Sequence, residues 1–268
     1  MIIIGELING TRDEVQKAIL TQDRDAIIDL AVRQSEAGAG YLDCNVGMAG
    51  EREPEQMRWL VECVQSVVDT PIAIDSTNPE AIAAGLGAWS GDKPPVLNSV
   101  TLERERLEQF LPLVRDREVR VIALAMDDAG VPSGVDGRID CARRLIETLE
   151  EAGVGREDIF VDPLVTPLSV TPEAARTVCD AIREINLGWP ECRTVVGLSN
   201  VSFGLPRRPL LNRTFLAQAV ASGLDSAILD PLDQDIMSTL YAAEALAGRD
   251  DWCTEYLSAY RHGLLGRA

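Results

Sequence analysis

Carboxylate and carboxamide side chains recur along this chain at the ends of short apolar segments. With one serine, they are Glu6 and Asn9, Asp43 and Asn45, Asp75, Asn98, Asp162, and Ser199 with Asn200. A single one of them could simply cap the helix that follows. Burying so many polar groups is costly, however, unless they pair with one another or with a ligand. Their number therefore predicts a binding site.

The chemistry of these side chains indicates which ligand they would bind. Asp and Asn can pair bidentately with the edge of a flat heterocycle that presents ring N–H and exocyclic NH2 groups. A pterin has such an edge. A hard cation is the alternative, because Asp, Glu and Asn oxygens also bind such ions. No closely spaced acidic motif supports a dedicated site, and we therefore expect no metal.

Other kinds of site are disfavoured by what the chain lacks. The stretch GLSNV at 197–201 resembles the nucleophile elbow of hydrolases but lacks its final glycine. The one histidine, His262, is distant in sequence from this stretch. There is no phosphate-binding loop of the GxxxxGK[ST] type. The six cysteines form no CxxC pair, which argues against a zinc site.

Charge and composition limit the partners and the location. The 268 residues include 25 Lys and Arg and 43 Asp and Glu, for a net charge of −18. Nucleic acids and anionic membranes are bound by clustered basic residues, so neither is expected here. Such acidity is typical of a highly soluble protein, or alternatively it steers a basic partner. Dispersed cysteines, and the absence of a signal peptide or an apolar span, predict a cytoplasmic protein.

Elements that could position the polar side chains alternate along the chain. Short apolar segments predict strands at 2–6, 41–45, 72–75, 96–98, 119–124, 159–162, 195–198 and 227–229. Helical patterns follow them at 23–36, 54–68, 79–86, 103–115, 140–152, 172–185, 214–222 and 235–246. Pro54, Pro79 and Pro172 stand in predicted first helical turns, and Asn78 and Thr171 at predicted N-caps.

Eight strand–helix pairs favour a closed barrel over an open sheet. We predict an α/β fold, a single-domain (β/α)8 TIM barrel over 1–249, followed by a C-terminal helical extension over 250–268. In such a barrel the strand ends and the loops after them form the mouth, where active sites lie. Trp252, Tyr256 and Tyr260 in the extension have helical spacing. They are expected to pack on the barrel or, alternatively, to form a dimer contact, and we expect a homodimer.

Seven stretches of the chain resemble one family in sequence and in order. They are IIIGELING (2–10), LDCNVG (42–47), AIDSTN (73–78), LNS (97–99), VDPLV (161–165), VVGLSNVSFGLP (195–206) and RPLLNRTFL (208–216). They are similar to the methyltetrahydrofolate:corrinoid methyltransferases of the pterin-binding barrel superfamily. That superfamily also holds dihydropteroate synthase and the folate module of cobalamin-dependent methionine synthase.

The resemblance implies an activity and its partners. Such an enzyme moves a methyl group, in either direction, between N5 of methyltetrahydrofolate and the cobalt of a corrinoid, a cobalamin carried by a partner protein. The folate is then a substrate, as tetrahydrofolate or methyltetrahydrofolate. A dihydropteroate synthase-like enzyme and a non-catalytic pterin-binding protein are the alternatives. The synthase is disfavoured because Lys17 and Lys93, the only lysines, do not match its lysine motif at the seventh strand.

The resemblance also implies residue roles. Asp75, Asn98 and Asp162 look like the trio that hydrogen-bonds the pterin ring, and Gly197 with Ser199 looks like the adjoining pocket wall. Glu6, Asn9, Asp43 and Asn45 complete the expected substrate-binding set.

The expected catalytic residues are Asn200, Asp75 and Asp162. Asn200 resembles the residue that donates to N5, while the carboxylates and water relay the proton that this nitrogen needs. Arg208 resembles an arginine beside the folate tail or the approach of the corrinoid. Phe203 departs from the glutamine of acetogen members and is similar to the methionine synthase module.

Overall fold

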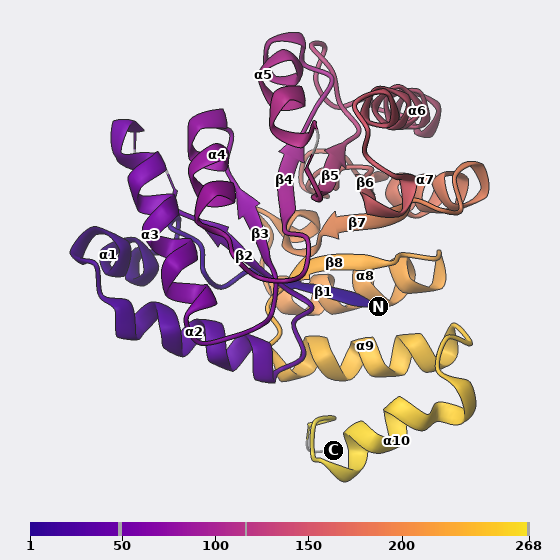
Figure 1. Cartoon of the computed structure of the whole chain (residues 1–268). Helices are drawn as coiled ribbons and strands as arrows, with labels where there is room; N and C mark the ends of the chain where they lie inside the picture. The colour runs from indigo at the N-terminus through magenta and orange to yellow at the C-terminus, as the bar shows by residue number, and fades with distance from the viewer. Residues whose placement is uncertain (48–49, 116, 267–268) are drawn as a thin grey trace.

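The computed structural model describes residues 1–47, 50–115 and 117–266. Eight parallel strands close into a barrel, in which each strand pairs with its sequence neighbours and β1 pairs with β8 (Figure 1). The strands are β1 (Ile2–Gly5), β2 (Tyr41–Asn45), β3 (Ile72–Asp75), β4 (Val96–Val100), β5 (Arg120–Leu124), β6 (Ile159–Asp162), β7 (Arg193–Gly197) and β8 (Ser226–Leu229). The predicted (β/α)8 barrel is confirmed, and every predicted strand overlaps an observed one.

Helices surround the barrel (Figure 1). They are α1 (Asp13–Thr21), α2 (Arg24–Glu36), α3 (Glu53–Gln65), α4 (Pro79–Ala88), α5 (Arg104–Val114), α6 (Val135–Glu151), α7 (Ala174–Gly188), α8 (Arg208–Ala221), α9 (Gln234–Leu246) and α10 (Thr254–Arg261). The sequence prediction missed α1, although its buried Val15, Ala18 and Ile19 follow helical spacing. It also began α8 six residues late, because Pro209 belongs to the first turn of that helix.

The observed first residues of the helices can be compared with the predicted N-caps and first turns. Asn78 caps α4, since its Oδ1 accepts the Glu80 N–H at 3.0 Å, and Pro54 and Pro79 lie in first turns as predicted. Thr171 and Pro172 were wrongly placed, because α7 begins at Ala174. The Ala174 N–H donates to the Thr171 carbonyl at 3.1 Å, which closes a separate turn before the helix.

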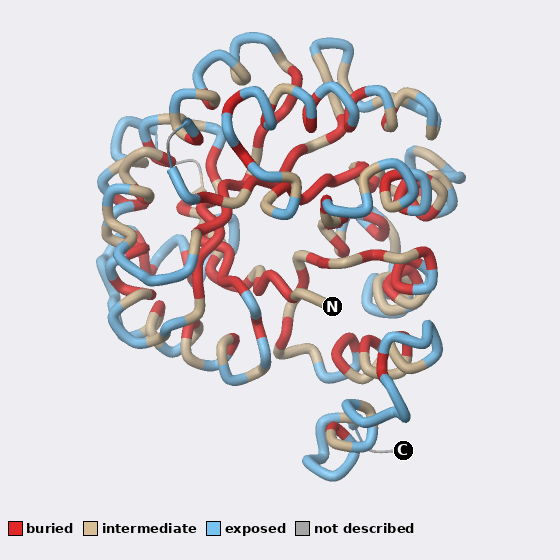
Figure 2. Tube along the Cα trace, turned by 45° about the vertical axis from the view of Figure 1, so that its right-hand side comes forward, coloured by how far each residue is buried: buried red, intermediate tan, exposed pale blue. Residues whose placement is uncertain are grey.

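The candidate site lies above a layer of apolar side chains inside the barrel, which we call the apolar plug. Apolar side chains that point into the barrel pack as one cluster. Its buried members are Ile4, Tyr41, Ala73, Val96, Ile122, Phe160 and Val195. Because side chains alternate along a strand, the residues two positions later also point inward, one layer nearer the mouth. That next layer contains Glu6, Asp43, Asp75, Asn98, Leu124, Asp162, Gly197 and, after Ile228, Asp230. Figure 2 shows the buried strands as red tube within the exposed helical ring.

The C-terminal segment lies outside the ring of helices. Helix α10 packs against α9 and buries Ala259 (Figure 1). Trp252 precedes α10 with a φ of 59° and is 94% exposed, and Tyr260 is 71% exposed. Packing of these two rings on the barrel was therefore wrongly predicted, because the left-handed backbone at Trp252 breaks the helical spacing. Residues 267–268 of the predicted extension lie outside the described residues.

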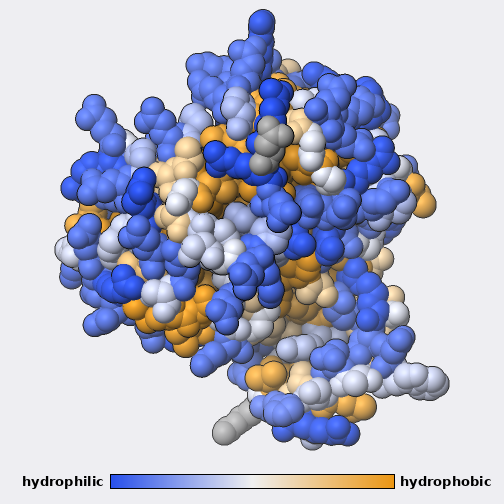
Figure 3. Space-filling view, viewed as in Figure 1, coloured by the Kyte–Doolittle hydropathy of each residue, from blue (hydrophilic) through white to orange (hydrophobic). Residues whose placement is uncertain are grey.

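The outer surface is polar over most of the face that Figure 3 shows, where hydrophilic side chains separate smaller apolar patches. Over the described residues, no helix combines the length and the apolar character that a membrane span requires.

Candidate functional site

Four polar side chains from β2, β3 and β4 form two hydrogen-bonded pairs at the mouth. Asn45 Nδ2 donates to Asp75 Oδ2 at 2.7 Å, and Asn98 Nδ2 donates to Asp43 Oδ1 at 3.1 Å. The strand register aligns Asn45 with Asp75, so their contact follows directly from the parallel pairing. Asn98 is aligned with Asp75 but reaches past β3 to bond Asp43 on β2. A further hydrogen bond joins the Asp43 and Asp75 carboxyls, so the two pairs form one group.

Burial controls the charge of this group. It raises the pKa of Asp43 well above its usual range, and the neighbouring Asp75 carboxylate raises it further. Burial also raises the pKa of Asp75, while the hydrogen bond from Asn45 lowers it. Two such close carboxyls cannot both ionise cheaply. The pair therefore resists double ionisation, and Asp43 is the carboxyl whose charged form burial disfavours more strongly.

Asp162 lies at the end of β6, across the barrel from β2. Its Oδ1 accepts the Leu164 N–H at 2.7 Å, and the Gly197 N–H also bonds its carboxylate. Burial raises the pKa of Asp162 to about 7, although these two N–H groups and the Arg138 guanidinium lower it. This carboxyl therefore changes charge near neutral pH.

Asn200 lies close to Gly197, the residue whose N–H bonds Asp162. It stands in the 3-10 turn η3 (Leu198–Ser202) after β7 and is exposed. A Cβ atom at position 197 would lie 3.2 Å from Asn200 Nδ2, so a glycine there leaves room for the amide. Within the described residues the Asn200 amide has no hydrogen-bond partner, which leaves its N–H groups able to donate to a ligand.

A cleft of about 260 Å³ opens beside these residues and is lined by Glu6, Arg12, Ser199, Arg208 and Asp230, among others. Burial raises the pKa of Glu6 to about 7, as does the Asp230 carboxylate, while the two arginines lower it. Arg208 Nη2 donates to the Ser199 carbonyl at 2.8 Å. The cleft thus joins a protonatable carboxyl to two cationic side chains.

The turn after β1 fixes the part of the mouth next to β2, where Asn9 pairs with Asn45. Asn9 Oδ1 accepts from the Thr11 N–H at 2.9 Å and from its hydroxyl at 2.7 Å, so this oxygen closes a turn. The Gly10 N–H donates to the Asn45 carbonyl at 2.7 Å. A Cβ at Gly10 would lie 2.4 Å from the Val46 carbonyl carbon, and only glycine permits this approach. The structure thus shows Asn9 organising the loop rather than bonding the carboxylate cluster.

Sequence reasoning missed several residues of the site. Asp230 follows β8 directly and could have been found by the strand-end pattern that identified Asp75 and Asp162. Arg12 stands between the glycine-containing turn and α1 with no comparable signal. In the described part of the chain, no group of three or more His, Cys, Asp or Glu residues is arranged to hold a metal ion.

Comparison with known proteins places this geometry in a family. The family profile described as pterin binding enzyme matches residues 5–230. A methylcorrinoid:tetrahydrofolate methyltransferase of Eubacterium limosum is 37% identical over 99% of this chain and 98% of its own. The methionine synthase of Mycobacterium leprae is 33% identical over 85% of this chain, which spans 20% of that larger protein.

Dihydropteroate synthases are among the solved structures with the same fold. The Yersinia pestis enzyme with a pterine-sulfa conjugate superimposes with a TM-score of 0.67 at 17% identity, covering 92% of this chain and 93% of that one. The Xanthomonas albilineans enzyme with 7,8-dihydropteroate gives 0.65 at 17% identity, over 91% and 92% of the two chains. At this identity the likeness concerns the fold alone. By the profile match and its relatives, the chain belongs to the pterin-binding enzyme family.

Proposed function

We propose that this protein is a methyltransferase that moves a methyl group between N5 of methyltetrahydrofolate and the cobalt of a corrinoid on a partner protein. The observation that carries the proposal is the layer of paired carboxyl and amide groups at the barrel mouth, in a chain so similar to a methylcorrinoid:tetrahydrofolate methyltransferase. The same site serves transfer in either direction. A dihydropteroate synthase activity is less well supported, since 193–203 contains no lysine.

The pterin edge binds to the inward carboxyl groups in this proposal. Asp75 and Asp162, when ionised, accept from the ring N–H and the exocyclic NH2, and Asn98 and Asn45 hold the neighbouring carboxyls in place. Hydrogen bonds with a charged acceptor are the stronger kind, which suits ligand recognition in a buried layer. Gly197 and Ser199 form the adjoining wall.

Proton supply to N5 follows from the same residues. An amine nitrogen that loses its methyl group must gain a proton or a strong hydrogen bond, and such assistance contributes about 10²–10⁴-fold in rate. Asn200 donates a hydrogen bond to N5, and water held by the network of carboxyl groups at the mouth relays the proton. Cobalt, when the partner brings it, accepts the methyl group, while this chain orients the folate. Arg208 lies where a folate tail or the partner approaches.

One assay tests the activity directly. The protein is mixed with methyltetrahydrofolate and Co(I) cobalamin, and the absorption spectrum is followed for methylcobalamin. The reverse reaction starts from methylcobalamin and tetrahydrofolate. Transfer in at least one direction is expected, and absence of transfer in both would refute the proposal.

Two variants separate chemistry from binding. Asn200→Ala should lower the transfer rate by about 10²-fold or more, with a small effect on the Kd for methyltetrahydrofolate, since the hydrogen bond to N5 strengthens in the transition state. Asp162→Ala should chiefly raise that Kd. Rates come from single-turnover spectroscopy and Kd from titration calorimetry. Equal loss of rate and affinity in the Asn200 variant would contradict its role.

We further propose that the protein is a cytoplasmic homodimer that binds neither nucleic acid nor membrane. The net charge of −18 supports the last two points. Exposed Leu246, Trp252 and Tyr260 on α9 and the segment after it offer apolar area for a subunit contact. Sedimentation velocity of the wild type and of Trp252→Ser tests the dimer, and a wild-type monomer at micromolar concentration would refute it.

A further inference from the structure

An arginine is the largest fully buried side chain of the described chain. Arg138, in the first turn of α6, is 1% exposed. Its Nη1 donates to the carbonyls of Pro163 and Leu164, in the loop directly after β6. Its Nε has no hydrogen-bond partner among the residues that the structure describes. A buried cation that is only partly satisfied is costly, which calls for a functional reason for its presence.

The two carbonyls that Arg138 binds belong to the turn that orients Asp162. The Leu164 N–H donates to Asp162 Oδ1 at 2.7 Å. Leu164 has a φ of 62°, a left-handed conformation that a leucine rarely adopts without outside support. By holding the carbonyls of Pro163 and Leu164, the guanidinium keeps this amide aimed at the carboxylate.

The charge of Arg138 also affects the pKa of Asp162. In the described part of the chain, Arg138 is the one charged side chain that contributes to the pKa of Asp162, which it lowers. The neighbouring strands contribute only the Gly197 N–H from β7 and the apolar Leu124, which pairs with Asp162, from β5. The charge balance at Asp162 therefore depends on this single cation.

We infer that Arg138 is a positioning residue for folate recognition, which fixes the turn at 163–164 and favours the ionised form of Asp162, the acceptor for the pterin N–H groups. This inference rests on the proposed function. Arg138 acts through Asp162 and its turn, since its two donated hydrogen bonds go to backbone carbonyls behind the carboxylate.

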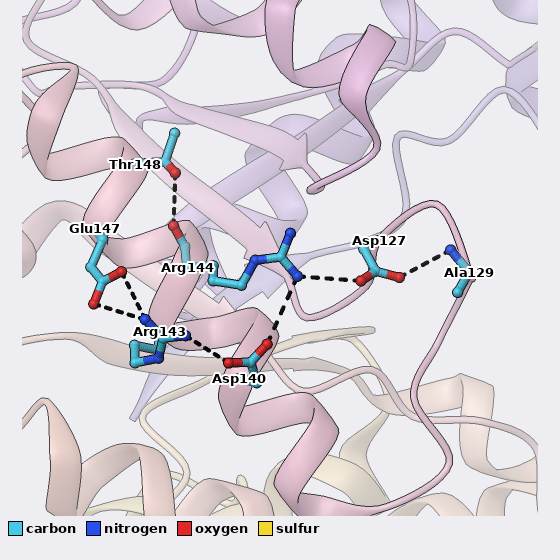
Figure 4. A network of polar contacts seen from close by, with 7 residues as sticks. All are labelled: Asp127, Ala129, Asp140, Arg143, Arg144, Glu147 and Thr148. Carbon is cyan, nitrogen blue, oxygen red and sulfur yellow. Dashed lines mark hydrogen bonds and ion pairs between the residues drawn. The ribbon is translucent and has the colours of Figure 1, made fainter.

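The rest of α6 supplies a matched control. On its exposed face, Arg144 pairs with Asp127 at 3.4 Å and with Asp140 at 3.8 Å, while Arg143 pairs with Asp140 and Glu147 (Figure 4). This network ties the loop after β5 to the helix but does not touch Asp162. Arg144→Gln removes a positive charge from the same helix and leaves the buried contact intact.

The test measures folate affinity against pH. The Kd for methyltetrahydrofolate is determined by titration calorimetry between pH 5.5 and 9 for the wild type, Arg138→Gln, Arg138→Lys, Arg144→Gln and Asp162→Asn. In the wild type, affinity should fall as pH decreases through the titration of Asp162, and Asp162→Asn should lack this fall. In Arg138→Gln the fall should move upward by about one pH unit, which weakens binding near pH 7 about fivefold. Arg138→Lys and Arg144→Gln should keep the wild-type midpoint.

Two results would overturn the inference. A loss of affinity in Arg138→Gln that is equal at every pH would show a role in stability alone. An upward midpoint in Arg138→Lys as large as that in Arg138→Gln would show that charge is not what matters, and the Lys variant decides the question if the Gln variant fails to fold.

A second readout needs no ligand. The infrared C=O stretch of the protonated Asp162 carboxyl, identified by its loss in Asp162→Asn, should have a higher midpoint in Arg138→Gln than in the wild type. An unchanged midpoint would refute the inference. If folate does not bind the wild type but this midpoint shifts, the proposed function fails while the coupling of Arg138 to Asp162 stands.

Discussion

Asp162 should make the stability of this protein depend on pH in a direction opposite to that of most carboxylates. Its carboxyl is buried, and burial raises its pKa from 3.8 to about 7. The folded protein therefore holds a proton that the unfolded chain releases. The sign follows from this difference. The contribution of Asp162 to stability is fully present below pH 3.8 and is lost as pH rises to about 7.

The size of the effect follows from the same two values. A pH unit is worth about 1.4 kcal/mol, so the interval from 3.8 to about 7 amounts to about 4 kcal/mol. Over the practical range from pH 5 to about 7, the loss is about 3 kcal/mol. Asn has the same shape and carries no charge. The free energy of unfolding of Asp162→Asn, relative to that of the wild type, should thus rise by about 3 kcal/mol between pH 5 and 8.

Urea denaturation followed by circular dichroism measures this difference at pH 5, 6, 7 and 8. Asp251→Asn, at an exposed position on the 3-10 turn η4 (Asp251–Cys253), controls for the loss of one carboxylate from an acidic chain. The difference between Asp162→Asn and the wild type should level off above about pH 7. If it stayed constant from pH 5 to 8, Asp162 would already be ionised at pH 5 in the folded protein. The argument from burial would then be refuted.

Three further predictions concern the backbone and helix ends that hold the site. Gly10→Ala should destabilise the fold by about 1–3 kcal/mol, because its Cβ would lie 2.4 Å from the Val46 carbonyl carbon. Gly87→Ala, in α4 with open space around it, should instead stabilise by about 0.5–1 kcal/mol. Asn78→Ala should cost about 1 kcal/mol through loss of the α4 cap, and Asn78→Ser should recover most of it. Urea unfolding measures all four, and a neutral Gly10→Ala or Asn78→Ala would contradict the contact it removes.

The barrel and its polar layer could be predicted because both depend on strand periodicity. Apolar runs such as 72–75 and 159–162 are typical of strands buried on both faces, and their bounds match the structure. Inward alternation then brings the last residue of each, Asp75 and Asp162, to the same rim. Pairing partners such as Asn45 with Asp75 followed only from the register, which one sequence does not specify.

The remaining features depend on tertiary contacts that leave no local pattern. In the sequence, Arg138 is one charged residue among several in an amphipathic helix. Only the loop after β6 covers it and offers backbone carbonyls to which its guanidinium donates. Trp252 has helical spacing to Tyr256, but a left-handed backbone at Trp252 interrupts the helix. Thr171 and Pro172 have the types of a helix start, yet the chain forms a turn there first.

The apolar plug beneath the polar layer has a kinetic consequence. Because Tyr41, Phe160 and their neighbours fill the barrel interior, a ligand reaches the site only from the mouth of the barrel. A folate whose pterin reaches Asp75 must enter before a large corrinoid protein covers that opening. Methyl transfer should accordingly proceed through a ternary complex in compulsory order, with the folate first to bind and last to leave. An excess of the corrinoid partner should then inhibit turnover, because it would cover the mouth of the barrel while the site is empty or still holds product.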